Sequence, residues 1–127
     1  MVILFDGAVD AVPGSTANTI IARAWEMLSD IGSHKRNVLS TMVAHLNDGI
    51  HDLLARRPYL LLQADGTRTT FTDLTTTTHE SQELPFGVDL HEGMAHYITS
   101  RVFEIDSSDE HNASLAVYHN NKYVEMT

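Results

Sequence analysis

The chain of 127 residues contains no cysteine, which excludes disulfide scaffolds, cysteine-ligated zinc sites and thiol catalysis. It also has no apolar run near the roughly 18 residues that a membrane-spanning helix needs. Residues 2–5 are apolar, but no basic region precedes them and Asp6 ends the run, so they do not resemble a secretory signal. We therefore expect a chain that makes no membrane contact and is assembled in the cytoplasm of a cell.

Basic residues are scarce as well: 8 lysines and arginines stand against 17 aspartates and glutamates, for a formal net charge of -9. A chain this acidic is not expected to bind duplex DNA or anionic lipid through its overall field. The charge is uneven, because residues 1–63 carry a formal charge of -1 and residues 64–127 carry -8. This division leaves room for two surfaces with different partners.

The local motifs of common active sites are missing too, including G-x-G-x-x-G, the phosphate loop and G-x-S-x-G. Eight histidines make a metal enzyme one hypothesis, and the nearest motif is His91-Glu92-Gly93-Met94-Ala95-His96. Zinc-binding helices place two histidines four residues apart, which is about 40° around the axis. Here the spacing is five, which separates the two imidazoles by about 140°. We therefore expect no catalytic, cofactor-binding or metal-ligating residue, and no enzyme.

One further set of polar residues has helical spacing. His45, Asp48 and Asp52 share a helix face and can be drawn as a base with carboxylates. The simpler interpretation is a solvated or subunit-contacting stripe in which Asp52 pairs with Arg56 at the i,i+4 spacing. Because such a pair contributes only about 0.3 kcal/mol, it supports a helix surface and establishes no site.

Apolar residues recur every three to four positions in the first half of the chain, which predicts two helices with one buried face each. The first begins after Thr16 and ends at Gly32, a residue suited to a C-cap. The second spans residues 37–55 and is ended by Pro58. The predicted buried positions are Ile21, Ala24, Trp25 and Leu28 in the first, and Leu39, Met42, Val43, Leu46, Ile50, Leu53 and Leu54 in the second.

Two more helices are predicted in the second half. Asp89 has the character of an N-cap, with Glu92 three residues later as in a capping box. Asp109 caps the fourth and weaker helix. The predicted buried positions are Leu90, Met94, Tyr97, Ile98, Arg101, Val102 and Ile105, followed by Ala113, Ala116, Val117, Asn120 and Val124.

Between these helical pairs the pattern changes to that of a β-hairpin at about residues 59–72, with Asp65-Gly66 as its turn. Eight of the twelve residues at positions 67–78 are threonine, and β-branched side chains favour extended backbone. We therefore predict a mainly α fold: a small four-helix bundle in two helical pairs with an inserted β-hairpin. Residues 1–15 form an N-terminal arm, and residues 16–127 form a single domain.

Several segments of the chain resemble the head–tail adaptor (connector) proteins of tailed bacteriophages, in particular those of the short-tailed type. The likeness spans about residues 17–124 and rests on packing and turn residues. The segments that carry it are Ile20-Ile21-Ala22-Arg23-Ala24-Trp25, Leu46-Asn47-Asp48-Gly49-Ile50-His51-Asp52-Leu53, Asp65-Gly66-Thr67-Arg68, Glu83-Leu84-Pro85, Gly93-Met94-Ala95-His96-Tyr97-Ile98-Thr99-Ser100-Arg101-Val102-Phe103 and Asn112-Ala113-Ser114-Leu115-Ala116.

The resemblance implies a structural virion protein without an active site or a required cofactor. Such adaptors sit in the neck between capsid and tail, usually as twelve copies, where they bind the portal protein and extend the DNA channel. A tail or nozzle protein attaches on the other side. An acidic channel would repel phosphates and let DNA pass without specific binding. This is the function that we expect.

Candidate partner contacts follow from exposed apolar arms and strand edges, which are natural docking elements. They are Ile3, Leu4 and Phe5 in the arm and Tyr59, Leu61 and Phe71 in the hairpin. The alternative for both sets is that they cover the monomer's own core. The basic pair Arg56 and Arg57 either interacts with the end of its helix or meets an acidic partner surface. A competing function is a stand-alone helical regulatory or ligand-binding module with a pocket between the helix pairs.

Overall fold

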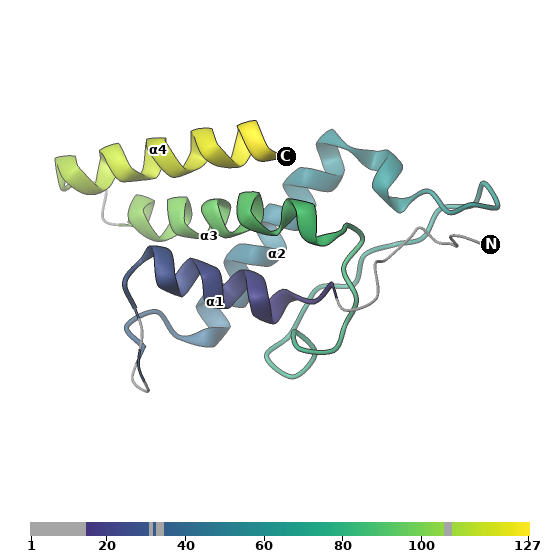
Figure 1. The fold of residues 1–127 in the computed structure, drawn as a ribbon, viewed down its shortest axis with the longest axis horizontal. Coiled ribbons are helices and arrows are strands. Elements are labelled where there is room, and N and C mark those ends of the chain that lie inside the picture. The colour runs from purple at the N-terminus through teal and green to yellow at the C-terminus, as the bar shows by residue number, and fades with distance from the viewer. Residues whose placement is uncertain (1–14, 31, 33–34, 106–107) are drawn as a thin grey trace.

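A computed structural model describes residues 15–30, 32, 35–105 and 108–127. Four α-helices are packed together, which confirms the predicted mainly α class, and no strand is formed within the described residues (Figure 1). Two short 3₁₀ turns accompany them. The elements are α1 (Ala17–Met27), α2 (Leu39–Arg56), η1 (Pro58–Leu61), η2 (Val88–Leu90), α3 (His91–Ile105) and α4 (Glu110–Met126).

Helix α3 is the centre of the fold, because it packs against α1, α2 and α4. In Figure 1, α4, α3 and α1 lie side by side and α2 crosses behind them. Residues 93–100 of α3 are all buried, so this helix has no solvent-facing stripe over two turns. A helix that is buried on every side has to be covered by several neighbours, and three separate helices do so here.

The predicted pairing of the first two helices differs from the structure, because α1 packs mainly on α3 and only slightly on α2. The connection between α1 and α2 explains this arrangement. The carboxylate of Asp30 accepts backbone N–H groups from Arg36 (2.9 Å) and Asn37 (2.8 Å), and the Trp25 indole donates to the Asn37 carbonyl (2.8 Å). These bonds tie the end of α1 to residues 36 and 37, just before α2, and α2 runs at an angle to α1 (Figure 1).

The buried face of α2 is the one that its apolar spacing predicts. Six of its seven predicted positions are buried and Leu39 is partly buried. In α1, Ile21, Ala24 and Leu28 are buried as predicted, whereas Trp25 is only partly so. The apolar period therefore identified the core faces of both helices correctly.

The predicted face of α4 is correct at Ala116 but wrong at Val117 and Val124. Val117 and Val124 are 60% and 56% exposed, and the buried residues are Ala116, His119 and Tyr123. The helix packs on α3 through aromatic side chains whose polar atoms have hydrogen-bond partners. A pattern based only on apolar residues does not detect such side chains. Ile105, predicted to be buried near the end of α3, is also exposed.

Only some of the helix caps predicted from the sequence are found in the structure. The Asp109 side chain caps α4 by accepting the backbone N–H groups of His111 and Asn112, as predicted. Asp89 does not cap α3, because it lies inside η2. Gly32 is not the C-cap of α1 either, since the helix ends at Met27 and Leu28 takes the capping position. Backbone bonds from Leu28, Ser29 and Asp30 to the carbonyls of Ala24, Glu26 and Trp25 close the last turn, so α1 ends earlier than its composition suggests.

The predicted β-hairpin is not formed. Residues 58–61 form the 3₁₀ turn η1, and the pairing beyond it is a single antiparallel bridge between Leu62 and Arg68. The predicted turn does exist, with Gly66 at φ +88°, a left-handed conformation that glycine adopts without strain. One bridge without a third strand is marginal, so the threonine-rich segment continues as a loop. This loop closes the core by burying Leu74, Leu84 and Phe86.

Candidate functional site

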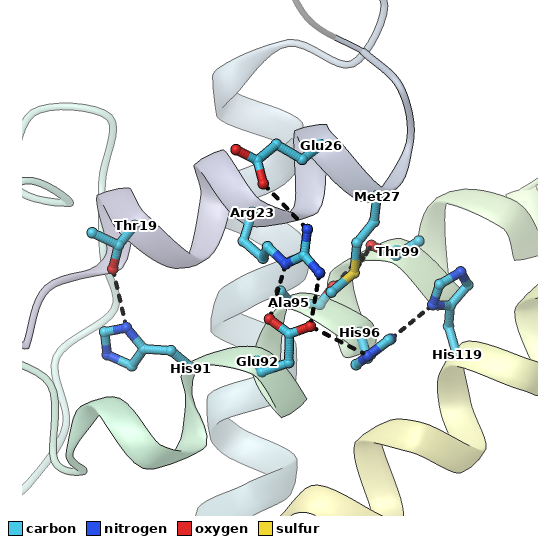
Figure 2. A network of polar contacts seen from close by, with 10 residues as sticks. All are labelled: Thr19, Arg23, Glu26, Met27, His91, Glu92, Ala95, His96, Thr99 and His119. Atoms are coloured by element: carbon cyan, nitrogen blue, oxygen red, sulfur yellow. Dashed lines mark hydrogen bonds and ion pairs between the residues drawn. The ribbon is translucent and has the colours of Figure 1, made fainter.

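A polar network covers the face of α3 that lies between α1 and α4 (Figure 2). At its centre, the guanidinium of Arg23 on α1 donates two hydrogen bonds to the carboxylate of Glu92 on α3, at 2.9 and 3.0 Å. A third bond from Arg23 reaches Glu26 at 3.2 Å. The bonds from Arg23 hold the pKa of Glu92 below its usual range, and those from both carboxylates raise the pKa of Arg23 further. Glu92 is therefore ionised and already paired.

Beside this pair, His96 of α3 and His119 of α4 face each other with their Nδ1 atoms 2.8 Å apart. Each histidine is only 8% exposed. The Phe103 ring stacks on His119 with an interplanar angle of 12°, and Tyr118 packs edge-on against both imidazoles. The pair is thus a buried polar contact inside the largest helix–helix interface of the fold.

Because the two Nδ1 atoms form one hydrogen bond, only one of them carries the hydrogen. The carboxylate of Glu92 lies 3.9 Å from His96 Nε2 and favours a hydrogen on that nitrogen. We therefore assign His119 Nδ1–H as the donor and His96 Nδ1 as the acceptor. Burial lowers the pKa of both histidines, and the proximity of His96 helps to lower that of His119 to about 4. Both rings are neutral at pH 7.

His91, the other histidine of the motif examined for metal binding, lies apart from this pair. Its Nδ1 lies 3.0 Å from the Thr19 hydroxyl, as Figure 2 shows, and its Nε2 lies 3.0 Å from the Ser15 hydroxyl. The five-residue spacing thus directs His91 toward the start of α1 and His96 toward α4. Within the described residues, no group of three or more histidine, aspartate or glutamate side chains is placed to hold a metal ion.

The predicted polar stripe of α2 is partly covered by α3 and α4. Asp52 pairs with Arg56 at 3.3 Å, as its spacing predicts, but it also accepts a 2.6 Å hydrogen bond from the Tyr123 hydroxyl. Burial and the Asp52 contact raise the pKa of that phenol above its ordinary value. His45 is partly covered, and its Nε2 has no hydrogen-bond partner in the described part of the chain. Burial lowers the pKa of His45.

Arg101 and Glu104 form an ion pair of 2.9 Å on α3 that lies between two shallow hollows. One hollow reaches His45 and Ile105, and the other reaches Val124. Arg101 also donates to the Tyr97 hydroxyl at 2.9 Å, which holds the guanidinium over the aromatic ring. This surface combines a charged pair with exposed apolar side chains.

The structure separates the predicted partner residues. Arg56 lies over the Tyr123 ring and donates to the Thr127 hydroxyl at 3.0 Å, so it serves the contact between α2 and α4. Arg57 donates to the hydroxyl of Tyr59 at 2.9 Å. Arg57 and Tyr59 line one hollow together with Met126 at the C-terminal end of α4. Tyr59 is exposed.

Leu61 and Phe71 come together in a different place, a groove of about 490 Å³ between η1 and the threonine-rich loop. Leu84 closes the groove from the core side. The arm residues Ile3, Leu4 and Phe5 lie outside the described residues.

Two features went undetected by the sequence patterns. The pairing of His96 with His119 joins two helices, and only the spacing of Ala116, His119 and Tyr123 along one face of α4 could have indicated it. The exposed apolar side chains of α4 were assigned to the core.

Searches against protein-family models, curated proteins and solved structures find no match to this chain. No family is therefore assigned from them. Among the described helices, none combines the length and apolar character needed to cross a membrane.

Proposed function

We propose that the chain is a structural adaptor of a tailed-phage virion, assembled as a ring of about twelve copies between the portal protein and a tail or nozzle protein. The proposal comes from the sequence segments that resemble such adaptors. The acidic charge of -9 is consistent with a channel through which DNA passes without binding.

The structural observation that supports it best is the outer surface of α4. This helix lies at the edge of the fold, and Val117, Tyr118 and Val124 are exposed on it. Val124 also borders the hollow that contains the Arg101–Glu104 pair. An apolar surface next to a charged pair suits a contact with another protein, and in a ring that protein is the neighbouring copy.

The test uses particles of the virus that encodes the chain. DNA-filled particles are banded on a gradient, and quantitative mass spectrometry counts this polypeptide relative to the portal protein. Near-equal amounts of the two are expected. DNA-filled particles that contain the portal protein but lack this chain would refute the adaptor function.

A pair of variants tests the role of α4 in the same assay. Val117→Glu places a carboxylate on the exposed apolar surface and is expected to reduce incorporation at least tenfold. His111→Glu adds the same group at another exposed position of α4 and is expected to leave incorporation unchanged. Equal incorporation of both variants would exclude the outer surface of α4 as a subunit contact.

One observation favours the second candidate, a ligand-binding module. The groove beside Leu61 and Phe71 falls in the size range of small-molecule sites, although it lies outside the helix pairs. A ligand there would raise the melting temperature of the isolated chain, and the increase would grow with the logarithm of the ligand concentration above its dissociation constant. Leu61→Glu should abolish that shift, and Tyr59→Glu, outside the groove, should preserve it. An isolated chain that no small molecule stabilises would leave the adaptor as the sole candidate.

A further inference from the structure

We propose that α4 is a releasable helix, held on α3 by the neutral His96–His119 pair, and that proton uptake by this pair frees α4 while α1, α2 and α3 stay folded. This inference concerns the isolated chain and does not depend on the proposed function. It rests on the geometry of the pair, on the charges around it and on the position of α4 in the fold.

The geometry leaves room for one hydrogen between the two rings. At an Nδ1–Nδ1 distance of 2.8 Å, His119 donates to His96 and the bond is satisfied. A proton added to His96 Nδ1 would bring two donors face to face, and protonation of His119 at Nε2 as well would place two positive charges together in a site where each ring is only 8% exposed. Phe103 stacks on His119 and the half-exposed Tyr118 packs edge-on against both rings, so the pair is held within the contact between α3 and α4.

The surrounding charges do not compensate for a doubly charged pair. Arg23 of α1 and Lys122 of α4 are cations that oppose protonation of His96. Glu92 of α3 favours it, but its carboxylate is already engaged by two bonds from Arg23. Burial is the largest effect on both histidines and acts against the charged form. Protonation of both rings therefore requires that His119 leave its site, and His119 belongs to α4.

Helix α4 is also placed so that it can leave separately. Its main contact is with α3, at one edge of the fold, whereas α1 and α2 pack on other sides of α3. Helices α1, α2 and α3 contribute Ile20, Leu46, Ile50, Met94 and Ile98 to the core, all fully buried in the complete fold, and α4 adds Tyr123 to the same cluster. Within α4 itself only Ala116, His119 and Tyr123 are buried, and segments with few buried residues open locally at lower free energy than the whole fold. The bonds of Tyr123 to Asp52 and of Thr127 to Arg56 anchor the far end of α4, so release begins in its N-terminal half.

The expected size of the effect follows from the ordinary histidine pKa of about 6.5. At pH 5.0 a free imidazole is about 30 times more often protonated than neutral. Each histidine that has to stay neutral in the packed state therefore favours release about 30-fold at pH 5.0 relative to high pH. If both histidines have to stay neutral in the packed state, release of α4 is favoured about 1,000-fold at pH 5.0 relative to high pH.

The experiment is amide hydrogen exchange of the full chain at pH 7.5 and 5.0, corrected for the intrinsic rate and resolved by residue. Protection of residues 113–121 in α4 is expected to fall at least 30-fold relative to α2 and α3. His119→Phe keeps an aromatic ring against Phe103 but cannot be protonated, so it should reduce the loss to the contribution of His96. His111→Gln, an exposed histidine on the same helix, should behave as the wild type.

Two outcomes would overturn the proposal: equal loss of protection in all four helices, or an undiminished loss in His119→Phe. If that variant does not fold, imidazole NMR of the wild type decides the question. The signals of His96 and His119 should then titrate together, at the pH where the α4 amides lose protection. Titration of either ring while α4 remains protected would refute the mechanism.

Discussion

Replacing Gly49 with alanine is expected to destabilise the fold by about 1–2 kcal/mol, because no space is left for a methyl group where α2 meets α3. A Cβ at this position would lie 2.7 Å from Cδ1 and 3.0 Å from Cγ of the Tyr97 ring. The ring cannot easily retreat. It packs against Tyr123 at a centroid distance of 4.9 Å, and its hydroxyl is held by Arg101.

The magnitude combines two opposing effects. Overpacking a closed core typically costs about 1–3 kcal/mol, and a displaced aromatic ring places this site in the upper half of that range. Alanine in the middle of a helix recovers about 1 kcal/mol through its better helix propensity. The difference corresponds to a melting temperature about 4–8 °C below that of the wild type for a chain of this size.

Thermal unfolding followed by circular dichroism measures this difference, and Gly93→Ala is the matched control. A Cβ at Gly93 would meet Cγ2 of Thr127 at 2.8 Å and Cβ of Met126 at 3.1 Å. These are small side-chain atoms of Thr127 and Met126 and not a packed aromatic ring, so the crowding is largely offset by the helix propensity of alanine, about 1 kcal/mol, and this variant should lose less stability than Gly49→Ala. A Gly49→Ala protein as stable as the wild type would refute the close packing of α2 on Tyr97.

Three further predictions concern single polar contacts. Asp109→Ala removes the α4 cap and should lower the free energy of unfolding by about 1 kcal/mol in urea titrations, whereas Asp89→Ala, which removes no cap, should change it by less than about 0.5 kcal/mol. Tyr123→Phe removes the 2.6 Å bond to Asp52 and should cost about 1 kcal/mol in the same measurement. Burial alone would raise the pKa of Asp30, but the hydrogen bonds it accepts outweigh that effect and lower it, so its stabilising contribution is fully present near pH 7 and is lost progressively as pH falls below about 4. The acid dependence of the melting temperature should accordingly be shallower in Asp30→Asn, and an unchanged dependence would contradict this role.

The parts of the fold that the sequence predicts are those where one physical effect dominates. The core face of α2 and the Asp109 cap are local patterns, and both are confirmed. The predicted hairpin failed because extended propensity in the threonine-rich segment has no third strand to pair with. The buried face of α4 was wrong because His119 and Tyr123 are buried through partners on α3 and α2, which are distant in sequence.

The candidate site was less predictable than the fold for the same reason. The network of Arg23, Glu92, His96 and His119 joins three helices, and none of its contacts except that between Glu92 and His96 has helical spacing. The five-residue spacing showed that His91 and His96 are not placed to share one metal ion. The partner of His96 lies on a different helix, and only the spacing of Ala116, His119 and Tyr123 on one face of α4 pointed to it.

The central position of α3 has a consequence for how the chain folds as it is synthesised. The ribosome completes α1 and α2 well before it reaches α3, and these two helices have little contact with each other. Their apolar faces therefore lack their native partner until Ile105 has left the exit tunnel. The nascent chain folds late and nearly at once, and its exposure to chaperones and to aggregation is greatest just before α3 emerges.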